Sequence, residues 1–504
     1  MTEVGTVVAT GAPWQRLSVR MLAVHPVREV LRAWPVLIGL LFFGRARRVD
    51  GGLWGLVALV VVVLLGLARW YTTTYRVTPE QVQVRRGLLR REVLTVPRDR
   101  VRTVDVTASP LHRLLGLARV VIGTGRSDRQ NDGLKLDALS TADAERLRTE
   151  LLHRPAAVTT QTPAAPGSEA VITRFQPAWL RYGPFSLSGL VIVGVVAGFL
   201  SRLANEANVQ FGFLETVAGW LARTAVWLAV VEVILLFLVV VAATSTAAYV
   251  VAYWGFRLSR QASGTLHIMR GLLTQRSITL EERRLRGVEL SETLLLRPVG
   301  GARCIAVATG LRVGRGAERG GSLLLPPAPF AEAVRVGADV LGDPVPLTVE
   351  LVRHGPRAAR RRYTRALVTT GAVPVAFGLL WWFAGSPAWL ALVALVLPAL
   401  GVPLAWDRYR NLGHALVGRH LVVREGSLVR RRTALNRDGI IGWNLRQSFF
   451  QRRAGVVTVE ATTAAGRQRY AAEDVPAGLA VPLIDQALPG LLAPFLDDRL
   501  GDRA

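Results

Sequence analysis

The fold class follows from residues 75–122, which read YRVTPEQVQVRRGLLRREVLTVPRDRVRTVDVTASPLHRLLGLARVVI. Apolar and polar residues alternate over 82–84, 93–96 and 101–106, and glycine or proline separates these runs. A period of two is typical of strands with one buried face. A helical pattern follows from Ser140 onward. The segment therefore predicts a small antiparallel sheet or barrel that a C-terminal helix closes.

This layout occurs three times in the chain, and residues 270–307 and 424–461 carry the second and third copies. Similar residue types fall at the same distances from the first glycine of each copy, without a gap. The matched sets are Gly87, Gly271 and Gly426; Val101, Leu285 and Ile440; Ser109, Thr293 and Ser448; and Gly116, Gly300 and Gly455. A fixed internal register of this kind predicts divergent triplication of one unit. A closing helix is expected near Phe330 in the second copy and over 479–492 in the third.

Long apolar runs precede each copy. A helix needs about 20 apolar residues to cross a bilayer. Between Arg365 and Asp407 lie 41 residues without an ionisable side chain, and Gly385-Ser386-Pro387 divides them with a turn signal. The sequence predicts six transmembrane helices in three pairs: 29–44 and 51–68, 182–201 and 220–243, and 364–384 and 387–406. Whether 29–44 crosses the whole bilayer stays open, because it is short.

Composition narrows the class of protein. The chain has 504 residues with 62 Lys and Arg against 36 Asp and Glu, a net charge of +26, yet 51% of its residues are hydrophobic. A disordered basic tail is more polar than this, and so is a soluble nucleic-acid binder, so no nucleic-acid partner is expected. One cysteine, Cys304, excludes a disulfide framework. Together these values indicate an integral membrane protein with basic parts in water.

Arginines flank the apolar runs and predict the orientation. They precede the first pair at positions 16–32 and the third pair at 353–365, and Arg408 and Arg410 follow the third pair. The turn at 385–387 carries no charge. By the positive-inside rule, both termini and all three β-domains are expected in the cytoplasm, under the plasma membrane. Arg45, Arg47 and Arg48 argue the other way. No secretory signal is visible.

The predicted class is therefore α+β, with each pair of membrane helices followed by a cytoplasmic β-domain. The expected order is 1–70 for the N-terminal segment and first pair, 71–153 for the first β-domain, 154–175 for a flexible linker, 176–255 for the second pair, 256–342 for the second β-domain, 343–363 for a basic linker, 364–406 for the third pair and 407–495 for the third β-domain.

A block of sequence within the first copy resembles a known family. The segments that carry the resemblance are Tyr75-Arg76-Val77-Thr78, Arg86-Gly87-Leu88-Leu89, Val96-Pro97-Arg98-Asp99-Arg100-Val101, Ser109-Pro110-Leu111 and Leu115-Gly116-Leu117. They resemble the bacterial pleckstrin-homology-like (PH-like) domain that follows transmembrane pairs in YdbT-like membrane proteins. The resemblance implies a seven-stranded curved sheet capped by a C-terminal helix, in a multi-pass membrane protein. It implies no enzymatic activity and names no ligand.

Arginine clusters are the main candidates for contact with a partner. Arg85, Arg86, Arg90 and Arg91 flank the turn at Gly87, and Arg430, Arg431 and Arg432 hold the matching place in the third copy. Turns tethered close to a bilayer could meet anionic lipid headgroups, at about 1 kcal/mol per basic residue. The alternative is that they are solvated turns of a protein that is basic throughout.

Glu232 is the one ionisable residue expected deep in an apolar span. An intramembrane carboxylate is costly and suggests a polar path, and hence a transporter or export component. The alternative is a protonated side chain that hydrogen-bonds to a neighbouring helix.

No catalytic set can be assembled from the sequence. The seven histidines are scattered without metal-ligand spacing, Cys304 sits in an apolar run, and the glycine-rich run 310–316 lacks the lysine of a phosphate-binding loop. The sequence therefore predicts a non-enzymatic membrane scaffold or binding protein without metal or cofactor. Its β-domains would contact protein or anionic lipid at the inner membrane face. Transport is the alternative function, and oligomerisation stays open.

Overall fold

The structure is a computed structural model of the chain. It describes residues 14–21, 60, 64, 68, 71–87, 91–98, 101, 103–123, 134–152, 169–186, 188–207, 219, 225–310, 323–385 and 387–491. The first predicted membrane pair lies outside the described residues, apart from single helical positions, as does the glycine-rich run after Gly310. The chain divides into two compact units, Met1–Glu282 and Arg283–Ala504, and each is described by itself.

The first unit begins, among the described residues, with seven strands and two helices. In order, these are β1 (Gln15–Arg16), β2 (Thr74–Val77), β3 (Gln81–Arg86), β4 (Glu92–Pro97), β5 (Thr103–Ala108), α3 (Pro110–Leu114), β6 (Leu117–Gly123), β7 (Leu134–Ser140) and α4 (Thr141–Leu152). Alternating residues such as Val82, Val84 and Val120 point into one core, which α4 closes with Leu147. The predicted strands and closing helix of the first copy are confirmed. We call residues 74–152 the first β-region.

The first unit continues with apolar helices between strands. Here the order is β8 (Ala170–Arg174), η2 (Pro177–Tyr182), α5 (Ser188–Ala207), α7 (Val226–Tyr253), β9 (Arg257–Gln261), β10 (Thr265–Arg270) and β11 (Gln275–Glu281). Strand β8 pairs with β9 across the two helices. It also falls inside the predicted linker 154–175, so that prediction is wrong for residues 170–174.

The second unit repeats this alternation of strands and helices. It contains η3 (Glu282–Arg284, at the boundary), β12 (Leu285–Thr293), β13 (Gly301–Ala308), β14 (Leu323–Pro329), α8 (Phe330–Leu341), α9 (Val345–Thr348), α10 (Gly355–Ala384), α11 (Ala388–Ala394), α12 (Val396–Arg410), β15 (Gly413–Val417), β16 (His420–Glu425), β17 (Val429–Asn436), η4 (Arg437–Gly439), β18 (Gly442–Arg446), α13 (Phe449–Ala454), β19 (Val456–Thr462), β20 (Arg469–Pro476) and α14 (Ala477–Ala487). We call residues 257–341 the second β-region and 413–487 the third.

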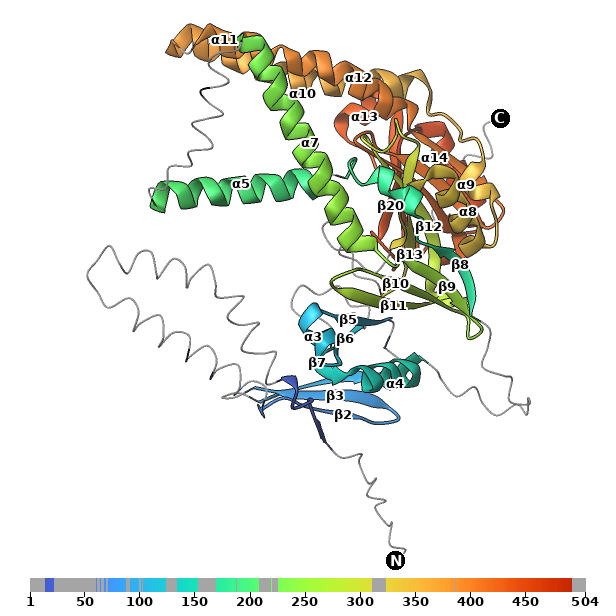
Figure 1. The fold of residues 1–504 in the computed structure, drawn as a ribbon. Coiled ribbons are helices and arrows are strands. Elements are labelled where there is room, and N and C mark those ends of the chain that lie inside the picture. The colour runs from blue at the N-terminus through green and yellow to red at the C-terminus, as the bar shows by residue number, and fades with distance from the viewer. Residues whose placement is uncertain are drawn as a thin grey trace, which may run out of the picture. The chain divides into compact units, whose positions relative to one another are not determined.

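The sheets do not follow the predicted domain boundaries. Strands are ordered β1-β2-β3-β4, β7-β6-β5-β11-β10-β9-β8, β14-β13-β12-β17-β16-β15 and β18-β19-β20. Each β-region thus divides its strands between two sheets, and β5 pairs with β11 as β12 pairs with β17. Figure 1 shows β5 beside β11 and the long strand β12 within the second unit. One self-contained seven-stranded sheet per copy, as the resemblance implied, is wrong, because each region completes a sheet with its neighbour.

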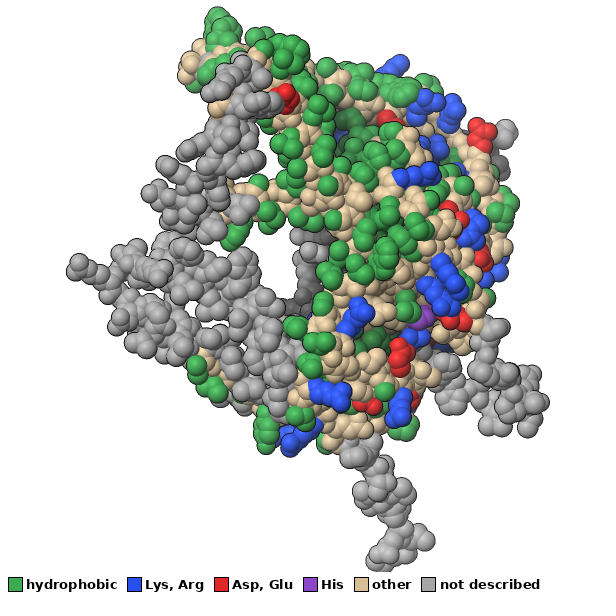
Figure 2. All heavy atoms as spheres, in the orientation of Figure 1, with side chains coloured by type: hydrophobic (Ala, Val, Ile, Leu, Met, Phe, Trp, Pro, Cys, Tyr) green, Lys and Arg blue, Asp and Glu red, His purple; other side chains and the backbone are tan. Residues whose placement is uncertain are grey.

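Three described helices are long and apolar enough to cross a membrane: Trp227–Tyr253, Gly355–Ala384 and Ala388–Arg410. A shorter apolar helix covers Ser188–Phe199. Hydrophobic side chains lie on the outside of α10, α11 and α12 in Figure 2, and only 0% and 17% of the apolar stretches of Gly355–Ala384 and Ala388–Arg410 are buried. These helices associate the protein with a membrane.

The helix boundaries differ from those the sequence predicted. The break at Gly385, whose φ is +65°, falls where the turn was predicted. Helix α10, however, begins at Gly355, so the predicted basic linker 343–363 is helical over its second half. Its arginines continue the helix because Arg is a good helix former. Helix α7 runs from Val226 to Tyr253, about six to ten residues later than the predicted span 220–243.

Candidate functional site

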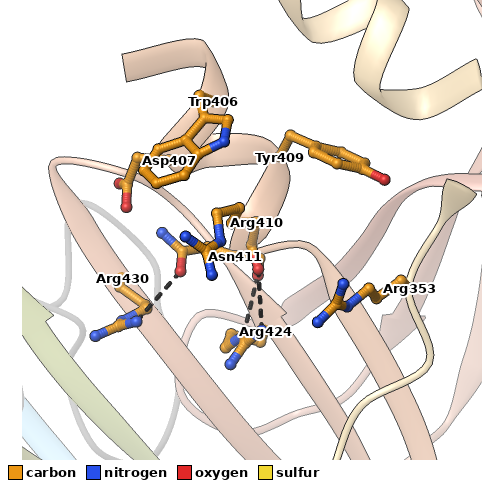
Figure 3. Close-up of a pocket in the computed structure, with 8 residues that line it drawn as sticks. All are labelled: Arg353, Trp406, Asp407, Tyr409, Arg410, Asn411, Arg424 and Arg430. Carbon is orange, nitrogen blue, oxygen red and sulfur yellow. Dashed lines mark hydrogen bonds between the residues drawn. The ribbon is translucent and has the colours of Figure 1, made fainter. Parts of the chain in front are cut away.

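A cavity of the second unit lies at the end of α12, where the chain enters the third β-region. Its volume is about 290 Å³. Its lining residues, drawn in Figure 3, are Arg353, Trp406, Asp407, Tyr409, Arg410, Asn411, Arg424 and Arg430. We call this cavity the arginine pocket.

Four parts of the chain place the arginines in this pocket. Arg353 precedes α10, Arg410 ends α12, and Arg424 and Arg430 come from the neighbouring strands β16 and β17. Strand alternation puts Arg424 opposite Arg432 in the β16·β17 ladder, so side chains of one face converge beneath the helix end. The pocket therefore depends on the register of two strands and on where α12 stops.

Some of these guanidinium groups already have partners. Arg424 donates to the backbone oxygens of Arg410 at 3.0 Å and Asn411 at 3.3 Å, which caps the last turn of α12. Arg430 donates to Asn411 Oδ1 at 3.3 Å and to Glu292 at 2.6 Å. Arg353 and Arg410 are exposed at the edge of the pocket, and Arg410 lies 4.6 Å from the centre of the Trp406 ring.

The pocket carries an excess of positive charge. Its one carboxylate, Asp407, is held by Arg297 at 2.7 and 2.9 Å and by the Ser427 hydroxyl at 2.8 Å. Burial, with the charges of Arg430 and Arg353, lowers the pKa of Arg424 below its usual value. Burial and Arg424 lower the pKa of Arg432 to about 10. Cations crowded in this way are stabilised by an added anion, because it relieves their mutual repulsion.

The sequence did not single out Arg297, although it is central here. Its side chain is only 12% exposed, and besides Asp407 it donates to the Ser427 backbone oxygen at the tip of the β16–β17 hairpin. Its position, 26 residues after Gly271, is also arginine in the other two copies, at Arg113 and Arg452. This arginine shared by all three copies is the sequence feature that could have identified Arg297.

A buried ionic cluster holds the apolar helices to the third β-region. Arg362 of α10 is 3% exposed and pairs with Glu473 at 2.8 Å and Asp474 at 2.5 Å. Arg361 also pairs with Asp474, and Arg408 of α12 reaches Glu473 at 3.3 Å. Both helices are thus tied to strand β20, so the end of α12 and the pocket beside it have a defined place in the fold.

Two buried histidines lie next to this cluster. His354 Nε2 and His414 Nδ1 are 2.9 Å apart, and His354 Nδ1 lies 2.7 Å from the Glu473 backbone oxygen. Burial lowers the pKa of both rings, that of His414 to about 4. Both are therefore neutral near pH 7, as packing residues.

The arginines predicted from the sequence fall in different surroundings. Arg430 lines the pocket, whereas Arg431 pairs with Glu289 at 3.3 Å and Arg432 donates to the Val349 backbone oxygen at 2.5 Å. These three lie within strand β17, not in a solvated turn.

In the first β-region the predicted cluster is more open. Arg85 and Arg86 end strand β3, Arg91 is exposed just before β4, and Arg90 lies outside the described residues. Arg86 approaches Glu92 at 3.9 Å. The structure thus separates this cluster from the arginine pocket in sequence and in surroundings.

Glu232 lies in the second turn of α7, because that helix begins at Val226 and not at 220. It therefore lies nearer to the start of this helix than the span 220–243 predicted, and a role for Glu232 in a transport path stays a prediction. Its Oε2 atom is buried without a hydrogen-bond partner among the described residues.

In the described part of the chain, no group of three His, Cys, Asp or Glu side chains could hold a metal ion. Cys304 is fully buried in β13, and burial raises the pKa of its thiol. It packs in the core, as its apolar sequence context predicted.

Comparison with known families identifies the class of domain. Residues 29–155 and residues 368–490 each match the family model described as a bacterial PH domain. The first and third β-regions lie within these two matched segments, each together with part of the segment that precedes it. Comparisons with curated proteins and with solved structures gave no match. A bacterial PH domain and apolar helices together indicate a membrane-associated or binding role.

Proposed function

We propose that the protein is a non-enzymatic, multi-pass scaffold of the plasma membrane whose arginine pocket binds the headgroup of an anionic lipid. The pocket carries the proposal, because four arginines converge there and the single carboxylate is already neutralised by Arg297. Trp406, at the mouth, is 48% exposed, and exposed tryptophans favour the membrane interface. An interfacial Trp406 would bring the pocket to the depth of the lipid phosphates, which supports the proposal.

Strand pairing supports three helical hairpins. Strand β8 precedes α5 and α7 and pairs with β9 behind them, while Val352 precedes α10 and bridges to His414 behind α12. Hydrogen-bonded partners lie on one side of a membrane, so the chain between them crosses an even number of times. With α7 and α10 each long enough to cross, two spans per pair are the simplest solution. Strand β1 pairs with β2 around the first predicted pair in the same way.

We further propose that the three β-regions are copies of one PH-like module and face the cytoplasm with both termini. The support is the shared element order in all three regions, together with the arginines that flank the third pair. We count the region 257–341 among these modules because of its order of strands and because its residues follow the same internal register.

Retention of lipid by the full chain tests the pocket. The protein would be reconstituted in nanodiscs of phosphatidylcholine with or without phosphatidylglycerol, and bound lipids would be counted by native mass spectrometry. Arg353→Gln combined with Arg410→Gln should reduce retained phosphatidylglycerol severalfold, since each basic residue near anionic lipid is worth about 1 kcal/mol.

The matched control is Arg335→Gln combined with Arg419→Gln, which removes the same charge from exposed positions outside the pocket. Equal retention in both double variants would contradict the proposal. Loss of bound lipid on adding millimolar inorganic phosphate, with the control variant behaving alike, would assign the pocket to free phosphate instead.

A further inference from the structure

Two strands at the ends of the series of β-regions have an open outer edge. Among the described residues, β4 pairs only with β3, and β18 pairs only with β19. In the other β-regions, the strands at these two positions are paired with each other: β5 with β11, and β12 with β17. The same two kinds of strand edge therefore pair at two junctions. Among the described residues, one edge of each kind, on β4 and on β18, stays unpaired.

The two internal junctions have the same register. At the first junction Gln275, four residues after Gly271, faces Ala108, which is 21 residues after Gly87. At the second junction Val429, three residues after Gly426, faces Thr293, which is 22 after Gly271. For each facing pair, we count how many residues each partner lies after the first glycine of its own copy. The two counts add up to 25 at both junctions, so the same register describes both.

Applied to the open edges, this rule predicts a register. Leu445 would face Val93, and Arg446 would face Glu92. Both pairs suit neighbouring strands, because the first is apolar and the second joins opposite charges. The second internal junction also carries ion pairs, Arg430 with Glu292 and Arg431 with Glu289.

Exposure of the open edges supports the same inference. Leu445 is 46% exposed, whereas its equivalents Val106 and Leu290, in paired strands, are 9% and 1% exposed. Val93 is 55% exposed, against 9% for its equivalent Ser277. Exposed apolar edges invite further strands, and native proteins seldom leave them unprotected.

A glycine of β18 fits a partner strand that the described residues of its own chain do not supply. Gly287 in β12 is obligatory, because a Cβ there would lie 2.1 Å from the Ala434 backbone oxygen of the paired strand β17. Its equivalent Gly442 has only the Thr462 hydroxyl, at 3.5 Å, near such a Cβ. The first β-region has Thr103 here, so this feature is shared by the second and third regions alone.

At each internal junction, an arginine donates a hydrogen bond to the equivalent backbone oxygen of the neighbouring β-region. Arg113 donates to the Leu272 backbone oxygen at 2.9 Å, and Arg297 donates to the Ser427 backbone oxygen. Each acceptor is one residue beyond the glycine of the next hairpin. Arg452, at the equivalent position of the third β-region, is exposed.

We propose that the chain assembles head to tail, with the outer edge of β18 in one copy pairing antiparallel with the outer edge of β4 in a second copy. Such an interface joins two different surfaces, so repetition gives a closed ring or an open row in the membrane. The partner is a second copy, because its first β-region offers the edge type, the apolar residue and the charge that the internal junctions use. Confinement of both copies in one bilayer raises their effective concentration.

Disulfide trapping between differently tagged full-length chains in membranes tests the assembly. One chain carries Val93→Cys and the other carries Leu445→Cys. The native Cys304 is fully buried and provides the unmodified background. Mild oxidation should give a reducible dimer that contains both tags, at least fivefold above the pair Thr95→Cys with Leu445→Cys. That pair is two residues out of register, and diagonal neighbours stand about 7–8 Å apart, too far for a disulfide.

Two further variants sharpen the outcome. Arg452→Ala in the Leu445→Cys chain should lower the yield severalfold, whereas the neighbouring Arg453→Ala should not. Gly442→Val should also lower it. Equal yields from the in-register and out-of-register pairs would overturn the proposal. So would a disulfide formed only within a single chain carrying both substitutions, or capture of a different protein at Leu445→Cys. Both cysteine positions are exposed, and unchanged thermal unfolding of each variant confirms that it folds.

Discussion

At Gly189 helix α5 passes so close to α7 that a side chain has no room. A Cβ on this residue would lie 2.1 Å from the Ser245 hydroxyl and 2.5 Å from the Val241 backbone oxygen. The Ser245 hydroxyl accepts from the Gly189 N–H at 3.0 Å and donates to the Ser186 oxygen at 2.9 Å. One glycine and one serine therefore fix the start of α5 against the end of α7.

Gly189→Val should therefore destabilise the contact between these two helices. Overpacking of this kind costs about 1–3 kcal/mol, and we expect a lower midpoint of thermal unfolding in detergent. Gly194→Val is the matched control, because no atom lies within 4 Å of a Cβ at that helical glycine. Equal effects of the two substitutions would show that the close contact is absent.

The histidine pair makes stability depend on pH in a defined window. The folded-state pKa of His354 and His414 lies below the usual value of about 6.5, that of His414 at about 4. The unfolded chain therefore binds more protons between these values, so stability is complete above about pH 6.5 and falls as the pH drops towards 4. Each unit of pKa difference is worth about 1.4 kcal/mol.

Unfolding midpoints measured from pH 7.5 to pH 4.5 test this dependence. The wild type should lose stability more steeply than the variant with both His354→Asn and His414→Asn, which cannot titrate at these positions. Carboxylates titrate in both proteins, so the difference between the two curves isolates the histidines. Parallel curves would contradict the assignment.

At the scale of elements, one ion pair joins the turn after β12 to the end of α12. Arg297 holds both oxygens of Asp407, and the two side chains are 12% and 28% exposed. Ser427, at the hairpin tip between β16 and β17, bonds to both partners. Helix, hairpin and turn therefore meet at a single carboxylate, next to the arginine pocket.

Arg297→Gln should lower the free energy of unfolding by about 3 kcal/mol, because it leaves a partly buried carboxylate without its cation. Asp407→Asn should cost less on its own. The double variant should be less destabilised than the sum of the two, and a double-mutant cycle measures this coupling. Additive effects would mean that the two side chains do not act as a pair.

Element boundaries explain how much the sequence could predict. Alternation located the strands, and the helical pattern from Ser140 onward located α4, which the structure places at Thr141–Leu152. Local patterns determine such features. The pairing of β5 with β11 is not local, because two edges of similar polarity compete for the same partner and only the three-dimensional arrangement decides.

The same limit applies to the candidate site. Charge density pointed to Arg430, Arg431 and Arg432 together, yet strand alternation gives each a different neighbour: the pocket, Glu289 and the Val349 backbone. Arg353 and Arg424 are far from each other in sequence, and neither belongs to the runs of arginines that the sequence singled out as binding candidates. Only the end of α12 brings them together, so the pocket could not be predicted from the run of arginines alone.

At the scale of the whole molecule, the backbone bridge that flanks helices α10 to α12 makes the proposed course of the chain through the membrane testable. Val352 bridges to His414 in the second unit, with N–O distances of 2.9 and 3.3 Å. Glu350, just before this bridge, and Arg419, in the turn after β15, are both exposed. Ala384 ends α10 and is also exposed. If α10 to α12 form a hairpin across the bilayer, the first two positions share one side and Ala384 lies on the other.

Single cysteines at these positions give the last prediction. In sealed right-side-out vesicles a membrane-impermeant maleimide should label Ala384→Cys and leave Glu350→Cys and Arg419→Cys unlabelled, and inverted vesicles should reverse the pattern. The physical reason is that the backbone bridge cannot form across a hydrocarbon core, where unpaired polar groups are too costly to expose. Labelling of Glu350→Cys and Arg419→Cys from opposite sides would contradict the backbone bridge between Val352 and His414. Labelling of all three from the same side would mean that α10 to α12 lie along the membrane and do not cross it.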